Sequence, residues 1–182
     1  MATLNLGPVD ELIAVRQAQH GGGRGAPPIH PDGTREGQAL NRAIVVMTSA
    51  TLQAYCEDVF FELSQIKLNL NAAQMESYRT LYSQWGNPSK ENTRKHFQRM
   101  GAIDILSGLS WQRCNNATVL KNLDRINQLR NQIAHGRQNL SLAGRNYSLS
   151  LAKARDHRNF VFQFGQRFEN HARRVLGLPV AP

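Results

Sequence analysis

Long stretches of this chain carry apolar residues at helical spacing, and segments rich in Gly and Pro separate them. From Leu40 to about Leu68 there is no Gly or Pro, and apolar side chains would cover most of a helix surface. Such wide apolar coverage predicts a central, buried helix. The same criteria predict four more helices, from Asn71 to about Trp85, from Pro88 to about Met100, from Thr118 to His135 and from about Ala152 to Leu176. The predicted fold class is therefore all-α, with about five helices.

Several predicted helix ends coincide with residues that commonly begin or stop helices. Pro88 suits the first turn of the third helix, with Asn87 as its cap. Gly101 ends that helix, and Gly136 is a natural residue just past the end of the fourth. The segment from Gly101 through Trp111 has a mixed pattern and predicts no single element.

The first part of the chain differs in composition from the rest. A short apolar piece around Leu12 precedes residues 20–37, which contain too much Gly and Pro to continue a helix. This stretch is predicted to be a loop or an arm. We therefore divide the chain into an N-terminal segment, 1–38, and a helical domain, 39–182, within one globular unit.

Apolar and polar residues alternate in residues 139–151, around the turn-like centre Ala143-Gly144-Arg145-Asn146. A short hairpin fits this alternation, and so does a loop that leads into the last helix. The sequence alone leaves both interpretations open.

The composition adds a strong positive charge to this picture. The 22 Lys and Arg residues against 13 Asp and Glu residues give a formal net charge of +9. A surface of this sign attracts polyanions, of which nucleic acid and anionic membrane surfaces are the two candidates.

The cysteines and the chain start point away from several classes of protein. Cys56 and Cys114 lie far apart and have no spacing typical of a zinc site or a disulfide framework. No secretory signal is visible, and every apolar run is interrupted before it reaches a membrane-spanning length. We therefore expect a cytoplasmic protein with no cofactor, no metal site and no membrane partner.

The candidate chemistry lies at the end of the fourth helix, in Arg130-Asn131-Gln132-Ile133-Ala134-His135-Gly136. Arg130 lies about 40° round an ideal helix from Ile126, on the apolar stripe that also contains Val119, Leu123 and Ile133. A buried arginine needs a partner. The sequence predicts either an ion pair with an acidic residue such as Glu57 or a groove that a ligand fills.

Asn127, Asn131 and His135 follow one another at four-residue spacing and share the face beside the arginine. Guanidinium and imidazole groups together suit phosphodiester chemistry, because one binds phosphate oxygens and the other transfers protons near neutral pH. A structural interpretation competes with this one. In it, His135 interacts with the helix dipole, Gly136 ends the helix and Arg130 covers apolar surface with its stem.

Other basic residues cluster in sequence near this motif. They are Arg94, Lys95, His96 and Arg99 on the third helix, Lys121 and Arg125 on the fourth, and Arg137 beyond it. Such residues either follow a nucleic-acid backbone or form ordinary solvated helix faces, and taken singly each favours the solvated interpretation. Only clustering around Arg130 and His135 would favour a phosphate-binding surface.

Three blocks of residues between positions 40 and 136 carry a further signal. They are Leu40-Asn41-Arg42-Ala43 continuing through Ala50-Thr51-Leu52-Gln53-Ala54-Tyr55 to Glu57-Asp58; Gly86-Asn87-Pro88-Ser89 with Glu91-Asn92 and Trp111; and the motif from Arg130 to Gly136. With these blocks the chain resembles the HEPN superfamily, specifically its RiboL-PSP type. The last block fits that family's pattern of Arg, a polar residue, a short spacer and His.

The resemblance implies an up-and-down helical bundle that dimerises, so that two copies of the motif meet in one cleft. It also implies a metal-independent endoribonuclease, often part of toxin–antitoxin or anti-phage systems, with an antitoxin or another defence protein as partner. The expected catalytic residues are Arg130, His135 and Asn131, and the expected substrate-binding residues are Glu57, Lys121, Asn127 and Arg137.

One position departs from related toxins, because Gln138 stands where some of them carry a tyrosine. Control by modification of that tyrosine is therefore not expected here. A non-catalytic HEPN bundle that binds nucleic acid, a nucleotide or a partner protein through Arg130 is the alternative function. A basic DNA-binding regulator is a third interpretation, although no helix-turn-helix spacing stands out.

Overall fold

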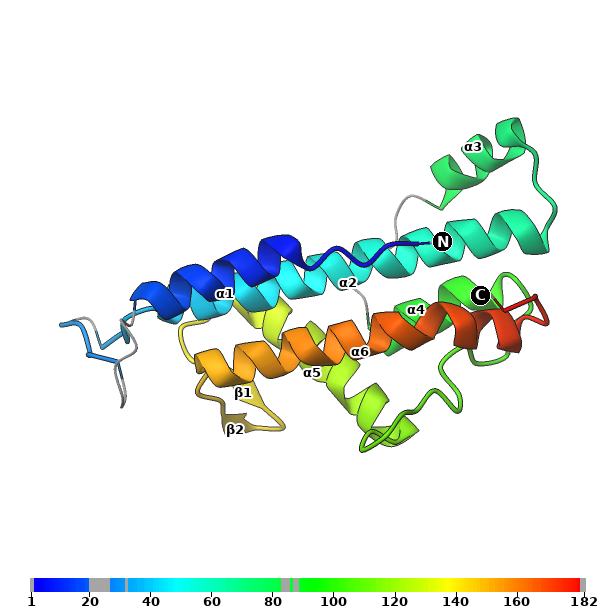
Figure 1. Ribbon diagram of the computed structural model, residues 1–182. Coiled ribbons are helices and arrows are strands. Elements are labelled where there is room, and N and C mark those ends of the chain that lie inside the picture. The colour runs from blue at the N-terminus through cyan, green and yellow to red at the C-terminus, as the bar shows by residue number, and fades with distance from the viewer. Residues whose placement is uncertain (1, 20–26, 32, 83–85, 87–88, 181–182) are drawn as a thin grey trace.

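The computed structural model describes residues 2–19, 27–31, 33–82, 86 and 89–180. Within these residues the chain forms six helices and one two-stranded hairpin (Figure 1). The elements are α1 (Gly7–Gln19), α2 (Gln38–Lys67), α3 (Ala72–Leu81), α4 (Lys90–Gln98), α5 (Asn116–Ala134), β1 (Ser141–Leu142), β2 (Arg145–Asn146) and α6 (Leu151–Val175). The all-α prediction is confirmed. The helix beyond the predicted five is α1.

The long helix α2 is the centre of the bundle, as its apolar coverage predicts. It packs against α1, α5 and α6, and Figure 1 shows α1 and α6 running beside it. Ile44, Leu52 and Phe60 on α2 are completely buried. Burying side chains of this size contributes about 1.5–3 kcal/mol each, so α2 supplies much of the hydrophobic stabilisation.

The far end of α2 is held by aromatic side chains. The Phe60 ring lies 5.9 Å from that of Tyr78 on α3 and 5.6 Å from that of Phe97 on α4. Phe97 in turn meets Phe168 of α6 at 5.5 Å between ring centroids. This aromatic cluster joins four helices at the end of the molecule where α3 lies (Figure 1).

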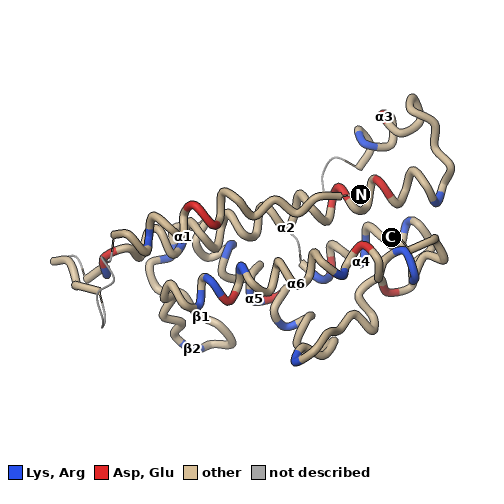
Figure 2. The backbone as a smooth tube through the Cα atoms, viewed as in Figure 1, with Lys and Arg blue, Asp and Glu red and all other residues tan. Residues whose placement is uncertain are grey.

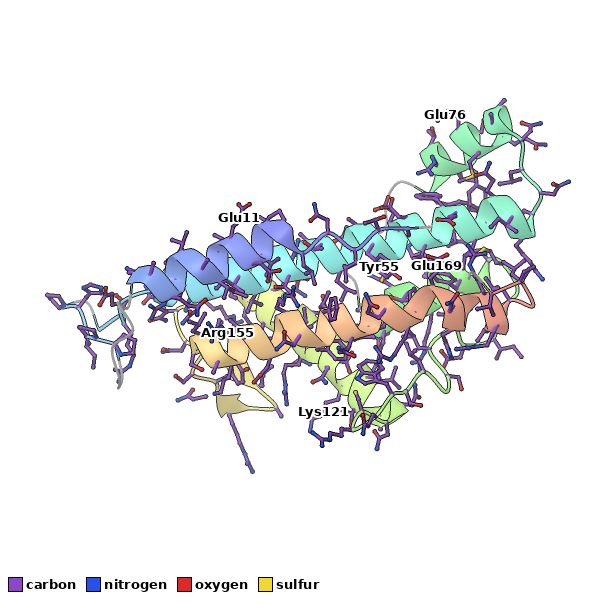
Figure 3. The ribbon with its side chains drawn as sticks, in the orientation of Figure 1. Glu11, Tyr55, Glu76, Lys121, Arg155 and Glu169 are labelled. Carbon is purple, nitrogen blue, oxygen red and sulfur yellow. The ribbon has the colours of Figure 1, made fainter. Side chains whose placement is uncertain are left out.

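Polar contacts also fix α6 against α2 along the interface between these two helices. The hydroxyl of Tyr55 donates a hydrogen bond of 2.7 Å to the carbonyl of Gly165, and both Tyr55 and Glu169 face this interface in Figure 3. Arg173 binds Glu169 at 2.7 Å and Glu62 of α2 at 3.1 Å. Because Arg173 and Glu169 are both buried, the pair satisfies two charges that would be costly alone.

Polar caps set the starts of four helices. Asn71, Ser89, Asn115 and Ser150 each accept a hydrogen bond from a backbone N–H in the first turn of α3, α4, α5 and α6. The predicted cap Asn87 lies outside the described residues, as do Pro88 and Trp85. The predicted start of the third helix is corrected, because Ser89 is the residue that caps α4.

The N-terminal segment 1–38 contributes α1 to the same hydrophobic core. Leu6, Val9 and Ile13 are buried there. On the exposed side of α1, Asp10 accepts two hydrogen bonds from Arg158 of α6, at 2.8 and 2.6 Å. These contacts join α1 to the helices of the predicted domain 39–182.

The segment between α5 and α6 is a hairpin. Ser141 pairs with Asn146 and Leu142 with Arg145 in antiparallel register. Both turn residues adopt positive φ, 50° at Ala143 and 73° at Gly144, which suits a tight two-residue connection. The hairpin interpretation of residues 139–151 is confirmed.

Candidate active site at the end of α5

The helix α5 presents one apolar stripe to the core and leaves its C-terminal end partly open. Val119, Leu123, Ile126 and Leu129 are buried with at most 2% of their surface exposed. The predicted stripe contained Ile133, but Leu129 takes the buried position in the penultimate turn and Ile133 is only partly buried. Arg130, the next residue, is half-buried at the edge of this stripe.

Within the described residues, the guanidinium of Arg130 has no carboxylate within ion-pair distance. Its one hydrogen bond runs from Nη1 to Oδ1 of Asn131, at 3.3 Å. A half-buried cation satisfied only by a neutral amide keeps most of its capacity to bind an anion. Of the two situations predicted for Arg130, the ion pair is not formed among the described residues, and the groove filled by a ligand stays a prediction.

The predicted ion pair between Glu57 and Arg130 is wrong. Glu57 is half-buried on α2, and its charged neighbours are Asp58 and Arg79 of α3. Burial and the nearby Asp58 raise the pKa of Glu57, while Arg79 opposes this shift. Glu57 lies about 22 Å further along α2 than Arg42, which contacts the chain just after α5, and this distance separates it from the motif.

His135 lies at the end of α5, where the backbone leaves the helix. Its N–H donates to the carbonyl of Asn131 at 3.0 Å, and Gly136 follows with a φ of 67°. The N–H of Gly136 binds the carbonyl of Ile133, and the N–H of Arg137 binds that of Gln132, both at 3.0 Å. These two bonds are those of a Schellman motif, which Gly permits at positive φ. They fix the backbone at His135 and leave its side chain exposed.

Two asparagines precede His135 on the same face of α5. Asn131 accepts the hydrogen bond from Arg130, so it connects the guanidinium with the face that bears the histidine. Asn127, one turn earlier, is partly buried, and its Oδ1 is buried with no hydrogen-bond partner in the residues that the structure describes. A buried amide oxygen in this state is uncommon in folded proteins.

The remaining predicted residues are spread more widely. Arg137 is exposed directly after the motif. Lys121 is exposed about 14 Å along the helix axis from Arg130 and points outward near the start of α5 (Figure 3). The structure thus brings Arg130, Asn131, His135 and Arg137 to one helix end, with Asn127 one turn away, and leaves Glu57 and Lys121 at a distance.

Two of the basic residues at α4, Arg94 and the C-cap Arg99, have contacts of their own, whereas Lys95 is exposed. Arg94 pairs with Asp104 at 2.8 Å. Arg99 lies over the ring of Tyr82 at 4.3 Å and contacts Nδ1 of the buried His96 at 2.7 Å. In Figure 2, Lys and Arg are distributed over several helices and interleaved with Asp and Glu. The solvated or structural interpretation therefore fits these α4 residues better than a phosphate-tracking surface.

Sequence reasoning missed Arg42 as a part of this site. From the first turns of α2, its Nη1 donates to the carbonyl of Arg137 at 2.9 Å, and its Nη2 donates to the carbonyl of Gln138. Arg42 therefore ties the chain that follows His135 to the central helix. Its only sequence signal was its place in the first block of the family resemblance.

A second missed feature is the pair formed by Tyr147 and His157. The Tyr147 hydroxyl lies 3.3 Å from Nε2 of His157, which is buried at the start of α6. Burial lowers the pKa of His157 to about 4; the positive charge of Arg125 on α5 adds to this shift, and Asp156 opposes it. This imidazole is therefore neutral at physiological pH and joins the hairpin region to α6.

No group of three or more His, Cys, Asp or Glu side chains among the described residues is placed to hold a metal ion. In the same residues, no helix combines the length and the apolar character needed to cross a membrane.

Comparison with known proteins adds one finding. Residues 27–173 match the family described as RiboL-PSP-HEPN. No curated protein and no solved structure matches the chain. The matched range contains α2 to α6 and includes the whole Arg130–Gly136 motif.

Proposed function

The chain belongs to the RiboL-PSP-HEPN family, and we propose that it is an endoribonuclease that cleaves RNA without a metal ion. The reacting groups are the guanidinium of Arg130 and the imidazole of His135, contributed by two copies of the chain. The observation that carries this proposal is a guanidinium without a carboxylate partner in the described part of the chain, five residues from an exposed histidine at a fixed helix end.

The proposed reaction is an internal transfer within RNA. The imidazole of His135 accepts the proton of a ribose 2′-hydroxyl while its oxygen attacks the adjacent phosphorus. The bond from phosphorus to the 5′-oxygen breaks, and a second imidazole donates a proton to that oxygen. The products are a 2′,3′-cyclic phosphate and a 5′-hydroxyl, and DNA is inert because it lacks the nucleophile.

Arg130 and Asn131 have supporting roles in this reaction. The guanidinium binds the phosphate oxygens on which negative charge grows as the pentavalent phosphorus forms. The hydrogen bond from Arg130 to Asn131 holds the guanidinium at the edge of the helix, and the Asn131 amide also positions the phosphate or the imidazole. Arg42 acts as a positioning residue, because it anchors the two carbonyls that follow the motif.

Helix geometry favours a site made by two chains. Five residues of an ideal α-helix turn through 500°, so Arg130 and His135 lie about 140° apart around the axis. One copy therefore presents the two groups in different directions. A second copy related by a two-fold axis brings its own motif opposite the first and also supplies the second imidazole.

The test compares cleavage of single-stranded and structured RNA by wild-type protein and two variants in excess chelator. Arg130→Ala and His135→Ala are each expected to lower the rate by at least a hundredfold. Arg174→Ala, which removes the same charge from an exposed position at the end of α6, should leave the rate unchanged. An RNA with one 2′-deoxyribose at the cleaved position should stay intact at that position. Cleavage that persists in both variants, or that is lost only with chelator, would contradict the mechanism.

A role as a toxin or anti-phage effector, held inactive by a partner protein, follows from this activity and from its family. Expression of the wild-type chain alone should then stop cell growth, and expression of His135→Ala at the same level should not. Equal growth of the two strains, with wild-type protein shown to be present and active on RNA, would refute the toxin role but not the nuclease.

A further inference from the structure

A cavity of about 720 Å³ is lined by Arg16 of α1, by residues just before and at the start of α2, and by the start of α6. Its wall includes Arg16, Asn41 and Tyr147, together with Ser150 to Ala152. This volume falls within the range of small-molecule sites, which runs from about 300 to 1,000 Å³. Residues 138–140, which follow the Arg130–His135 motif in the chain, form another part of the wall.

Arg16 is the most unusual residue of this wall. Only 3% of its surface is exposed, and its one side-chain hydrogen bond within the described ranges runs from Nη2 to the carbonyl of Glu36 at 3.1 Å. Its Nε and Nη1 are buried and have no hydrogen-bond partner in the part of the chain that the structure describes. Glu36 also lines the cavity, but no carboxylate of the described residues lies within ion-pair distance of Arg16. A buried guanidinium in this state is costly, and an anion in the cavity would remove most of that cost.

The neighbouring backbone is shaped around this arginine. Gly37 has a φ of 71°, and a Cβ atom at this position would lie 2.0 Å from Nε of Arg16. Any other residue at position 37 would therefore displace the guanidinium as well as strain the turn. The close packing of Gly37 therefore holds the Arg16 side chain in place, unlike a mobile arginine on the surface.

Two further features of the wall match a ligand that has both an anion and hydroxyl groups. Asn41, 5% exposed, donates from Nδ2 to the carbonyl of Leu149 at 3.1 Å, and its buried Oδ1 has no partner among the described residues. That oxygen can accept a hydrogen bond from a ligand hydroxyl. The first turn of the 25-residue helix α6 lines the same cavity, and its leading N–H groups have no acceptor within the helix.

We propose that this cavity binds a small phosphate monoester with hydroxyl groups, of the size of a sugar phosphate or a nucleotide. The guanidinium of Arg16 binds the phosphate, and the side-chain amide of Asn41 accepts a hydrogen bond from a ligand hydroxyl. Arg35, which is exposed on the wall, adds positive charge at the edge of the cavity. The site lies apart from Arg130 and His135, and a ligand here would touch the chain that follows them.

The test measures binding by calorimetry and by thermal shift, using the full chain with ribose 5-phosphate, adenosine 5′-monophosphate, ribose and inorganic phosphate. We expect at least one of the two monoesters to bind at least tenfold more tightly than inorganic phosphate, and ribose to show no binding. A preference between ribose 5-phosphate and the nucleotide assigns the source of the phosphate group.

Two variants make the assignment to this cavity specific. Arg16→Met keeps an unbranched apolar stem and removes the unpaired buried charge, so the free protein should melt at the same or a higher temperature while the binding is lost. Ala152→Asp lies in the exposed first turn of α6, where a carboxylate stabilises a helix but repels a phosphate in the cavity. It should fold normally and bind at least tenfold more weakly. Arg145→Gln, an exposed charge outside the wall, is the matched control and should bind as the wild type does.

Four results would overturn the proposal. Three of them are the absence of binding by either monoester, equal binding by inorganic phosphate, and unchanged binding by Ala152→Asp. Binding of a 5′-phosphorylated oligoribonucleotide without binding of either small monoester would also overturn it, because the site would then be part of an RNA surface. None of these results depends on RNA cleavage, so the proposed nuclease and the proposed cavity ligand stand or fall separately.

Discussion

The buried His157 predicts a specific loss of stability in acid. Its imidazole has a pKa of about 4 in the folded protein and an ordinary value of 6.5 when unfolded. Between these two values the unfolded chain binds a proton that the folded chain does not, so the free energy of unfolding falls as the pH falls. The stabilisation is complete above pH 6.5 and is lost progressively down to about pH 4.

The magnitude follows from the separation of the two pKa values. A difference of about 2.5 pKa units corresponds to about 3 kcal/mol when the loss is complete, and to about 2 kcal/mol at pH 5. Burial of the ring and the positive charge of Arg125 on α5 lower the pKa of His157, and Asp156 on α6 opposes them. The Tyr147 hydroxyl lies 3.3 Å from Nε2. A loss of this size is a large part of the stability of an ordinary domain.

Urea unfolding of wild type and His157→Gln at pH 7.5 and pH 5 measures this contribution. Other titrating groups affect both proteins alike, so they cancel in the comparison. The substitution should cost stability at pH 7.5, and this cost should shrink by about 2 kcal/mol at pH 5. The reasoning would be refuted by an equal cost at both pH values, or by a direct titration that places the pKa of His157 in the folded protein near 6.5.

Three further substitutions test the fold and the site. Phe60→Ala should lower the free energy of unfolding by about 3–5 kcal/mol, measured in urea, because it empties the centre of the aromatic cluster. Gly136→Ala should cost about 1–2 kcal/mol in the same assay, since nothing lies within 4 Å of the added Cβ and only the φ of 67° opposes it. Arg42→Ala should slow RNA cleavage by roughly tenfold through the loss of its two carbonyl contacts, with little change in melting temperature. A slow variant that is also unfolded would refute the positioning role.

The parts of the fold that could be predicted from sequence depend on local signals. The helices α2, α5 and α6 begin and end within about two residues of their predicted limits, because their apolar periodicity is long and Gly or polar caps flank them. The hairpin was one of two interpretations of residues 139–151, because turn-forming residues lie at the centre of an alternating segment. The start of α4 was wrong because two capping residues, Asn87 and Ser89, flank Pro88 and the sequence does not rank them.

Contacts between distant elements could not be predicted in the same way. The burial of Leu6 and Val9 depends on where α1 lies relative to α2 and α6, and this relation has no periodic signature. The motif from Arg130 to His135 was recognisable because its residues are neighbours in the sequence. The wrong partner for Arg130 and the missed role of Arg42 have a common cause, since both depend on how α2 lies against α5.

The most direct test of the central claim measures activity in mixtures of wild type and His135→Ala chains. The two are refolded together from urea, so that dimers form at random, and RNA cleavage is followed at constant total protein. A site that needs the imidazoles of both chains predicts that an equal mixture keeps about a quarter of the wild-type rate. An equal mixture of wild type and Arg174→Ala chains should keep the full wild-type rate. A rate of one half, together with a monomeric mass in sedimentation, would contradict the shared site.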